Sequence, residues 1–261
     1  MTSIVQDLTP PISKSLVQTR PRFWEIDALR GVAIVMMVIY HLMWDLLLFG
    51  VLTNVALQQG FWKYFQRTTA STFIFLVGVV LVVSYKRDLN HDNASFRKFF
   101  WRGAKIFGWG MVLSVIVRMA GVGRIDFGVL HLIGAAIILA YPFLGYRWSN
   151  IGLWALFNVV GYLLQPLRVG TSWLVWLGLK PTDYTYLDYF PLVPWFGVVL
   201  LGIGVGNLLY NNNQRRFSLP NLSQLASVKS LAWLGRRSLM IYLLHQPALF
   251  ALLFTIFWLR S

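Results

Sequence analysis

Apolar residues along the chain fall into seven blocks, which are separated by shorter polar stretches. Each block is close to the roughly 20 residues with which an α-helix crosses the hydrocarbon core of a bilayer. The pattern therefore predicts an all-α fold, a polytopic transmembrane helix bundle of about seven spans. The blocks lie at 28–49, 64–85, 101–120, 126–144, 150–166, 190–210 and 238–258.

The segments outside these blocks suggest a single membrane domain, 26–261, behind a cytoplasmic N-terminal tail, 1–25. The tail holds Pro10, Pro11 and Pro21 and has no continuous apolar core, so it does not read as a secretory signal peptide. A short apolar stretch at 171–179 cannot span a bilayer, and we expect an interfacial or re-entrant helix there. The polar stretch at 211–225 predicts a cytoplasmic loop.

The distribution of positive charge predicts the orientation of the bundle. Of the 23 lysines and arginines, 16 lie on the side of the N-terminus and seven on the other side. Because cytoplasmic loops carry the excess of Lys and Arg, the N-terminus is predicted to be cytoplasmic and, with seven spans, the C-terminus external.

Composition supports a membrane protein and excludes several other classes. The chain is 57% hydrophobic and 12% charged, about half the charged fraction of a soluble domain. Its net charge of +14 does not indicate nucleic acid, because the basic residues flank the apolar blocks, where they contact membrane lipid headgroups. Cysteine is absent, which excludes disulfides, a thiol nucleophile and thiolate metal ligands.

The first apolar block carries ionisable residues along one face. Helix geometry places Arg30 and His41 about 20° apart around the axis and about 16 Å apart along it, with Asp45 about 6 Å further. Ionisable groups on one face of a membrane helix point into a bundle or a wet cavity. The stripe therefore runs from the cytoplasmic edge past the middle of the membrane.

Three histidines lie inside apolar blocks and are candidates for chemistry. The i, i+4 spacing of His41 and Asp45 allows a hydrogen bond that would orient the imidazole as a general base. His131 lies in the fourth block and His245 in the last. The residues alone leave three alternatives open: polar contacts that only join helices, a metal site of His41, Asp45 and His131, and a proton relay.

Four segments of the sequence resemble a known family. They are RFWEIDALRGVAIVMMVIYHLMWD, STFIFLVGVVL, FGVLHLIGAAIIL with YFPLVPWFGVVLLGIG, and GRRSLMIYLLHQP. In order and spacing they are similar to the heparan-α-glucosaminide N-acetyltransferase catalytic-domain family, especially its short bacterial members, and to polytopic membrane acyltransferases. The resemblance implies acetyl-CoA as a cytoplasmic acyl donor, a sugar or other hydroxyl or amine acceptor on the opposite face, and a bacterial-type plasma membrane.

The resemblance also suggests roles for individual residues. In related acyltransferases the first-span histidine is the base, which falls on His41 here. The eukaryotic glucosaminide enzymes place their catalytic histidine after the first span, where this chain has GVLTNVALQQGFWKYFQ and no histidine, so their heparan substrate does not carry over. We assign catalysis to His41, Asp45 and His131, and donor binding to Arg30, Arg102, Lys105 and His245, with no metal.

Two other functions fit the same stripe. A small-solute or proton-coupled transporter would use the polar face as a permeation path. A non-catalytic membrane assembly protein would use it only to join helices. The sequence leaves the acceptor, the acyl chain length and the oligomeric state open, a homo-oligomer included.

Overall fold

A computed structural model of the chain describes residues 22–90, 94–182, 184–211 and 214–259. The regular structure of the described part is helical, as predicted, apart from one pair of short antiparallel strands. The predicted tail lies mostly outside the described residues, and the first helix begins at Trp24. The helices are α1 (Trp24–Leu48), α2 (Gly60–Leu89), α3 (Phe96–Met119), α4 (Val129–Leu139), α5 (Trp148–Leu164), α6 (Leu192–Leu209), α7 (Ala226–Arg236) and α8 (Ser238–Trp258), with 3-10 turns η1 (Tyr141–Phe143) and η2 (Ser172–Leu174) and antiparallel strands β1 (Tyr210–Asn211) and β2 (Gln214–Arg215).

Five helices of the described structure are long and apolar enough to cross a membrane: α1, α2, α3, α6 and α8. Two further apolar helices, α4 and α5, are shorter. α4 ends at Leu139 and a 3-10 turn that contains Pro142 follows, because proline lacks the N–H that would continue the helix. The count of about seven spans therefore stays a prediction.

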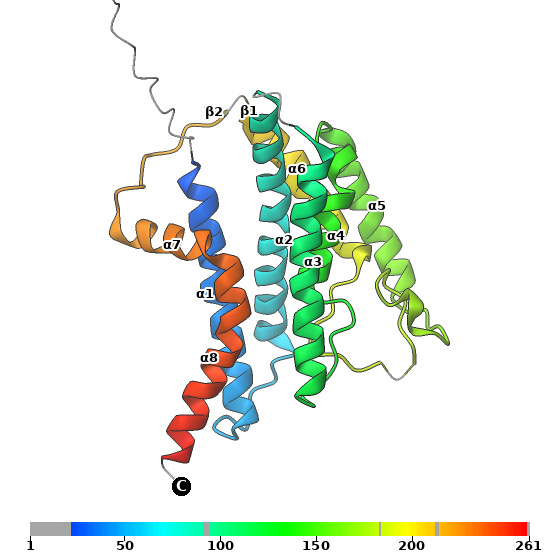
Figure 1. Cartoon of the computed structure of the whole chain (residues 1–261), viewed down its shortest axis with the longest axis vertical. Coiled ribbons are helices and arrows are strands. Elements are labelled where there is room, and N and C mark those ends of the chain that lie inside the picture. The colour runs from blue at the N-terminus through cyan, green and yellow to red at the C-terminus, as the bar shows by residue number, and fades with distance from the viewer. Residues whose placement is uncertain (1–21, 91–93, 183, 212–213, 260–261) are drawn as a thin grey trace, which may run out of the picture.

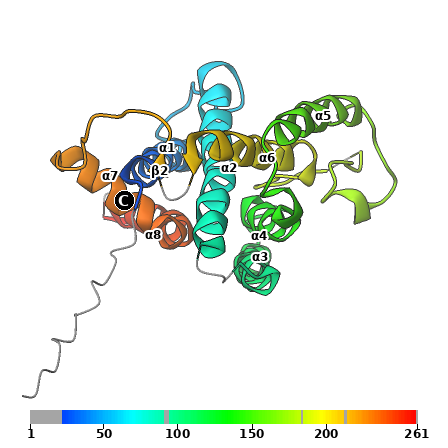
Figure 2. The same ribbon diagram turned by 90° about the horizontal axis from the view of Figure 1, so that it is seen from above.

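The long helices form two groups that meet at α2. Viewed from above, α1, α7 and α8 lie on one side of α2, α3, α4 and α5 lie on the other, and α6 crosses α2 (Figure 2). α2 packs against α1 on the first side and against α6 on the second, while α3 packs on α4 and α5 on α6. The largest buried apolar cluster lies among α2, α4 and α6 and includes Ile74, Leu132 and Leu200.

Glycines permit the closest helix contacts. Gly78 of α2 faces the backbone of α6 at Val199, and Gly202 of α6 faces the backbone of α2 at Phe75, so a Cβ atom at either glycine would overlap the opposite helix. Gly31 of α1 lies against the backbone of Leu231 in α7 in the same way. Small residues thus let these backbones approach, as is typical of membrane bundles.

Two segments differ from the expectations. Residues 171–179 form no continuous helix but the short turn η2, and the carbonyls of Trp176 and Leu177 accept hydrogen bonds from Leu192 and Val193 at the start of α6. The sequence pattern also did not predict α7, an amphipathic helix that follows the polar stretch 211–225 and lies across α1 (Figure 1). α7 carries the chain directly into α8.

Candidate active site

The polar stripe of α1 faces α8 along its whole length. The two helices run in the same direction, since residues later in α1 contact residues later in α8. The common face predicted from helix geometry is therefore the face that meets α8. Arg30 Nη2 donates to Ser238 Oγ at 2.9 Å, the rings of His41 and His245 lie 4.7 Å apart between centroids, and Gln246 Nε2 donates to Asp45 Oδ1 at 2.6 Å.

The hydrogen bonds of the two paired histidines define their tautomers. His41 Nδ1 lies 2.9 Å from the carbonyl of Met37, and His245 Nδ1 lies 2.7 Å from the carbonyl of Tyr242. A carbonyl accepts only from a protonated nitrogen, so in the neutral rings Nδ1 carries the hydrogen and Nε2 carries the lone pair. His245 Nε2 is buried and has no partner in the described structure. Each ring therefore offers a basic nitrogen.

Asp45 is a fully buried carboxylate, with an exposed fraction of 0%. Gln246 satisfies one carboxylate oxygen, while Oδ2 has no hydrogen-bond partner among the described residues. The direct bond from His41 that the spacing allows is not formed, because His41 Nδ1 donates to Met37 instead. A protonated His41 would still be attracted to the Asp45 carboxylate. The carboxylate is thus placed to stabilise an imidazolium after His41 accepts a proton.

A group of arginines lies toward the end of the bundle where α1 begins. Arg102 of α3 lies close enough for its charge to interact with those of Arg30 and Arg87, so three helices supply guanidinium groups to one region. The nearby carboxylate of Asp88 pairs with Lys98 at 2.6 Å. Arg102 and Lys105 are exposed, one turn apart on α3. Guanidinium groups gathered in this way suit a phosphate-bearing ligand.

His131 belongs to a different contact group, between α4 and α3. Its ring is 2% exposed and packs against Phe107 and Phe127, with centroids 5.0 and 5.7 Å away. Its Nδ1 accepts the N–H of Gly128 at 3.2 Å, so in the neutral ring the hydrogen lies on Nε2, which is buried without a partner in the described structure. The Nε2 atom of His131 is therefore a hydrogen-bond donor, whereas the Nε2 atoms of His41 and His245 are acceptors.

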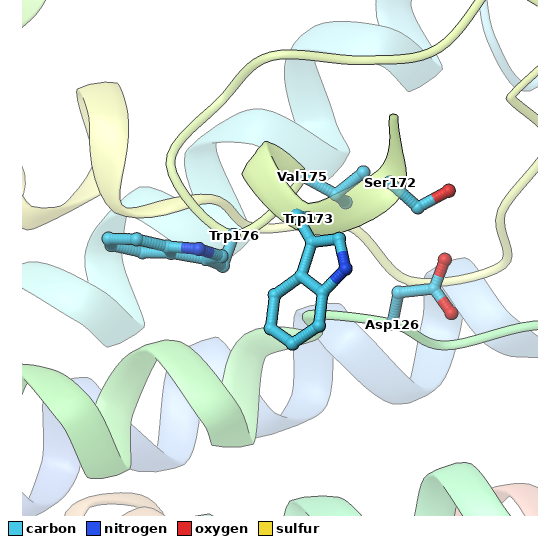
Figure 3. A pocket seen from close by; sticks show the side chains of 5 residues that line it. All are labelled: Asp126, Ser172, Trp173, Val175 and Trp176. Atoms are coloured by element: carbon cyan, nitrogen blue, oxygen red, sulfur yellow. The ribbon is translucent and has the colours of Figure 1, made fainter. Parts of the chain in front are cut away.

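A shallow hollow of about 300 Å³ lies between η2 and the loop that precedes α4 (Figure 3). Its lining combines two exposed indole rings, a carboxylate and a hydroxyl, a mixture that can contact both the apolar and the polar faces of a small polar molecule. The sequence analysis did not single out these residues. They are Asp126, Ser172, Trp173, Val175 and Trp176.

Other polar partners were also missed as site residues. Gln246 directly follows His245, and only its depth in an apolar helix could have indicated a role. Asp188, which lies between α4 and α8, stands in the aromatic segment 184–190, where nothing in the spacing points to a site. Within the described ranges no three His, Asp or Glu side chains are grouped to hold a metal ion.

Three comparisons with known proteins add to this geometry. A family model described as "Heparan-alpha-glucosaminide N-acetyltransferase, catalytic" matches residues 22–247. Searches of curated proteins and of solved structures gave no significant match. The matched range begins just before α1 and ends at Pro247, so it contains every residue of the α1–α8 cluster described above.

Proposed function

Since the chain belongs to the heparan-α-glucosaminide N-acetyltransferase catalytic family, a family of membrane acetyltransferases, we propose that it moves an acetyl group from acetyl-CoA to a sugar or other hydroxyl or amine acceptor across the membrane. The observation that supports this most is the His41–His245 pair, whose Nε2 atoms are free to accept a proton beside the buried carboxylate of Asp45.

In this proposal the donor binds at the arginine group. Arg30 and Arg102, with Lys105 one turn further along α3, bind the phosphates of acetyl-CoA at the cytoplasmic end of the bundle. The acetyl end reaches down the α1–α8 interface, and His245 contacts it there because its ring touches His41. The excess of basic residues on the N-terminal side supports a cytoplasmic location for this end.

The chemistry is a direct transfer. His41 Nε2 removes the proton from the acceptor hydroxyl or amine while the acceptor atom bonds to the acetyl carbonyl carbon. The carbon–sulfur bond then breaks, and the proton passes from His41 to the departing CoA thiolate. Asp45 stabilises the imidazolium between these steps, and the Nε2–H of His131 donates to the carbonyl oxygen as it gains charge.

The acceptor approaches from the opposite side, and the hollow lined by Trp173, Trp176 and Asp126 is the region proposed to receive it (Figure 3). Indole faces pack against the apolar side of a small ring, while the carboxylate and Ser172 bind its hydroxyl or amine groups. The proposed topology has seven crossings, with α4 and α5 as the two short ones, and a bacterial-type plasma membrane as the location.

A thiol assay tests the proposal cleanly because the chain has no cysteine. Purified protein in detergent is mixed with acetyl-CoA and glucosamine, and a thiol-reactive dye then reports only the CoA that is released. The proposal predicts acetyl-CoA binding by calorimetry and CoA release that depends on the acceptor. Protein that binds no acetyl-CoA and releases no CoA with any amino sugar or polysaccharide tested would contradict it.

A further inference from the structure

Asp188 lies between the two groups of histidines. Its Oδ2 atom accepts the backbone N–H of Val129 at 3.0 Å and lies 3.4 Å from the hydroxyl of Tyr242, which donates a long hydrogen bond. Val129 is the first residue of α4, and Tyr242 lies one turn into α8. A single carboxylate oxygen therefore joins helices that belong to different sides of the bundle.

One partner of Asp188 contacts a histidine, and the other directly follows a residue that does. The carbonyl of Tyr242 accepts from His245 Nδ1 at 2.7 Å, so the residue that bonds Asp188 also orients the His245 ring. On the α4 side, Gly128 donates its N–H to His131 Nδ1 while Val129 donates to Asp188. His131 and Asp188 thus accept hydrogen bonds from the N–H groups of two consecutive residues at the start of α4.

The surrounding backbone holds the Asp188 carboxylate in place. Leu187 N donates to Arg124 O at 3.1 Å, and Phe190 N donates to Phe127 O at 2.9 Å, so hydrogen bonds fix the chain on both sides of Asp188. A Cβ atom at Gly128 would overlap Asp188 Oδ2, so this position needs glycine for the carboxylate to reach α4. The positive end of the α4 dipole also favours a negative group there.

We propose that Asp188 is a positioning residue, which links the start of α4 to α8 and so holds His131 in a fixed position relative to the His41–His245 pair. This inference rests on the proposed acetyl transfer, because it requires His131 and the α8 histidine to act on one reacting carbonyl. Asp188 touches neither reactant in this account. It acts through Tyr242 and through the start of α4.

Kinetics distinguish positioning from a role in folding. Asp188→Ala removes both hydrogen bonds and is expected to lower kcat between about 10- and 100-fold, because small displacements of reacting groups are costly, while the KM for acetyl-CoA changes little. Asp188→Asn keeps an acceptor oxygen and is expected to retain most of kcat, and Tyr242→Phe is expected to lower it as Asp188→Ala does. Asn158→Ala, which removes one exposed hydrogen bond to Trp154 O within α5, is the control and should leave kcat unchanged.

A distance measurement tests the same inference without an acceptor. The cysteine-free chain accepts spin labels at two introduced cysteines, Leu244→Cys on α8 and Met111→Cys on α3, both at exposed positions. α3 packs on α4, so the label at Met111 reports the α4 side of the molecule. Asp188→Ala should broaden or shift the label distance, and Asn158→Ala should not.

The outcomes separate this inference from the proposed function. Wild-type protein that neither binds acetyl-CoA nor releases CoA with glucosamine would contradict the proposed function. Active wild-type protein, together with Asp188→Ala protein of unchanged kcat and unchanged label distance, would overturn the positioning role of Asp188 while leaving the transfer reaction in place. A fall in kcat that Asp188→Asn largely restores would support the positioning role.

Discussion

The imidazole rings of His41 and His245 meet edge to face, with centroids 4.7 Å apart and planes inclined by 81°. They come from helices at opposite ends of the sequence, and each ring uses Nδ1 to bond a carbonyl of its own helix. Both Nε2 atoms are left to accept a proton. The pair is the centre of the proposed site, and several consequences of its surroundings can be measured.

Gln246 supports the buried carboxylate beside this pair. Replacing it in Gln246→Leu leaves Asp45 without its hydrogen bond, which is expected to cost about 1–3 kcal/mol of stability because an unsatisfied buried acceptor keeps its desolvation penalty. The melting temperature in detergent, followed by tryptophan fluorescence, checks this. Leu244→Ala, an exposed position on the same helix, is the control, and equal melting temperatures for the two variants would contradict the role of Gln246.

The arginines should govern donor affinity. Arg102→Gln is expected to raise the Kd for acetyl-CoA about tenfold, since charge-assisted hydrogen bonds to phosphate contribute about 1.5–3 kcal/mol. Calorimetry at low and moderate salt measures the effect, which should be larger at low salt. Arg118→Gln removes a cation from the opposite end of α3 and should leave the Kd unchanged. An equal rise in the Kd for acetyl-CoA in both variants would show that the net charge of the protein, rather than a specific site, attracts the donor.

Gly31 controls the packing of α7 across α1. Gly31→Ala would place a Cβ atom against the backbone of Leu231, and the resulting overpacking is expected to destabilise the protein by about 1–3 kcal/mol. Gly108→Ala in α3 meets open space, so it should not destabilise the protein and should slightly favour the helix. Thermal unfolding of the two variants compares them directly. A Gly31→Ala protein as stable as Gly108→Ala would contradict the close contact between α1 and α7.

The protonation of Asp188 should make stability depend on pH. Burial raises the pKa of Asp188 to about 6, although the hydrogen bonds from Val129 and Tyr242 partly oppose this. Between about pH 4 and 6 the folded state then binds more protons at this site than the unfolded state, so the contribution of Asp188 to stability falls as pH rises. Asp188→Asn removes this titration. The melting temperature of the variant minus that of the wild type should therefore increase from pH 4 to 6 and level off above about pH 7. A constant difference across this range would contradict the raised pKa.

Much of the fold can be predicted from the sequence because apolar block length is a direct consequence of bilayer thickness. The ranges expected for the first, second and last spans overlap α1, α2 and α8 almost completely. The fourth was predicted too long, because Pro142 lies inside an apolar run and ends α4 early. α7 was missed because its apolar face is only a few residues wide and follows a polar stretch.

The site was predictable only within one helix. A period of 3.6 residues places Arg30, His41 and Asp45 on one face, but it cannot tell which helix covers that face. The partners on α8 lie about 200 positions away in the sequence, as the separation of 201 between Asp45 and Gln246 shows. Asp188 illustrates the same limit, because its importance comes from a contact between the start of α4 and Tyr242.

Substitution of His41 tests the central claim most directly. CoA release from acetyl-CoA in the presence of glucosamine is measured for wild-type protein, His41→Ala and His41→Gln, with the Kd for acetyl-CoA and the melting temperature measured alongside. If His41 is the general base, both variants should lose about 100-fold or more of the release rate while binding acetyl-CoA with unchanged affinity. Folded variants that bind acetyl-CoA and release CoA at close to the wild-type rate would contradict the account.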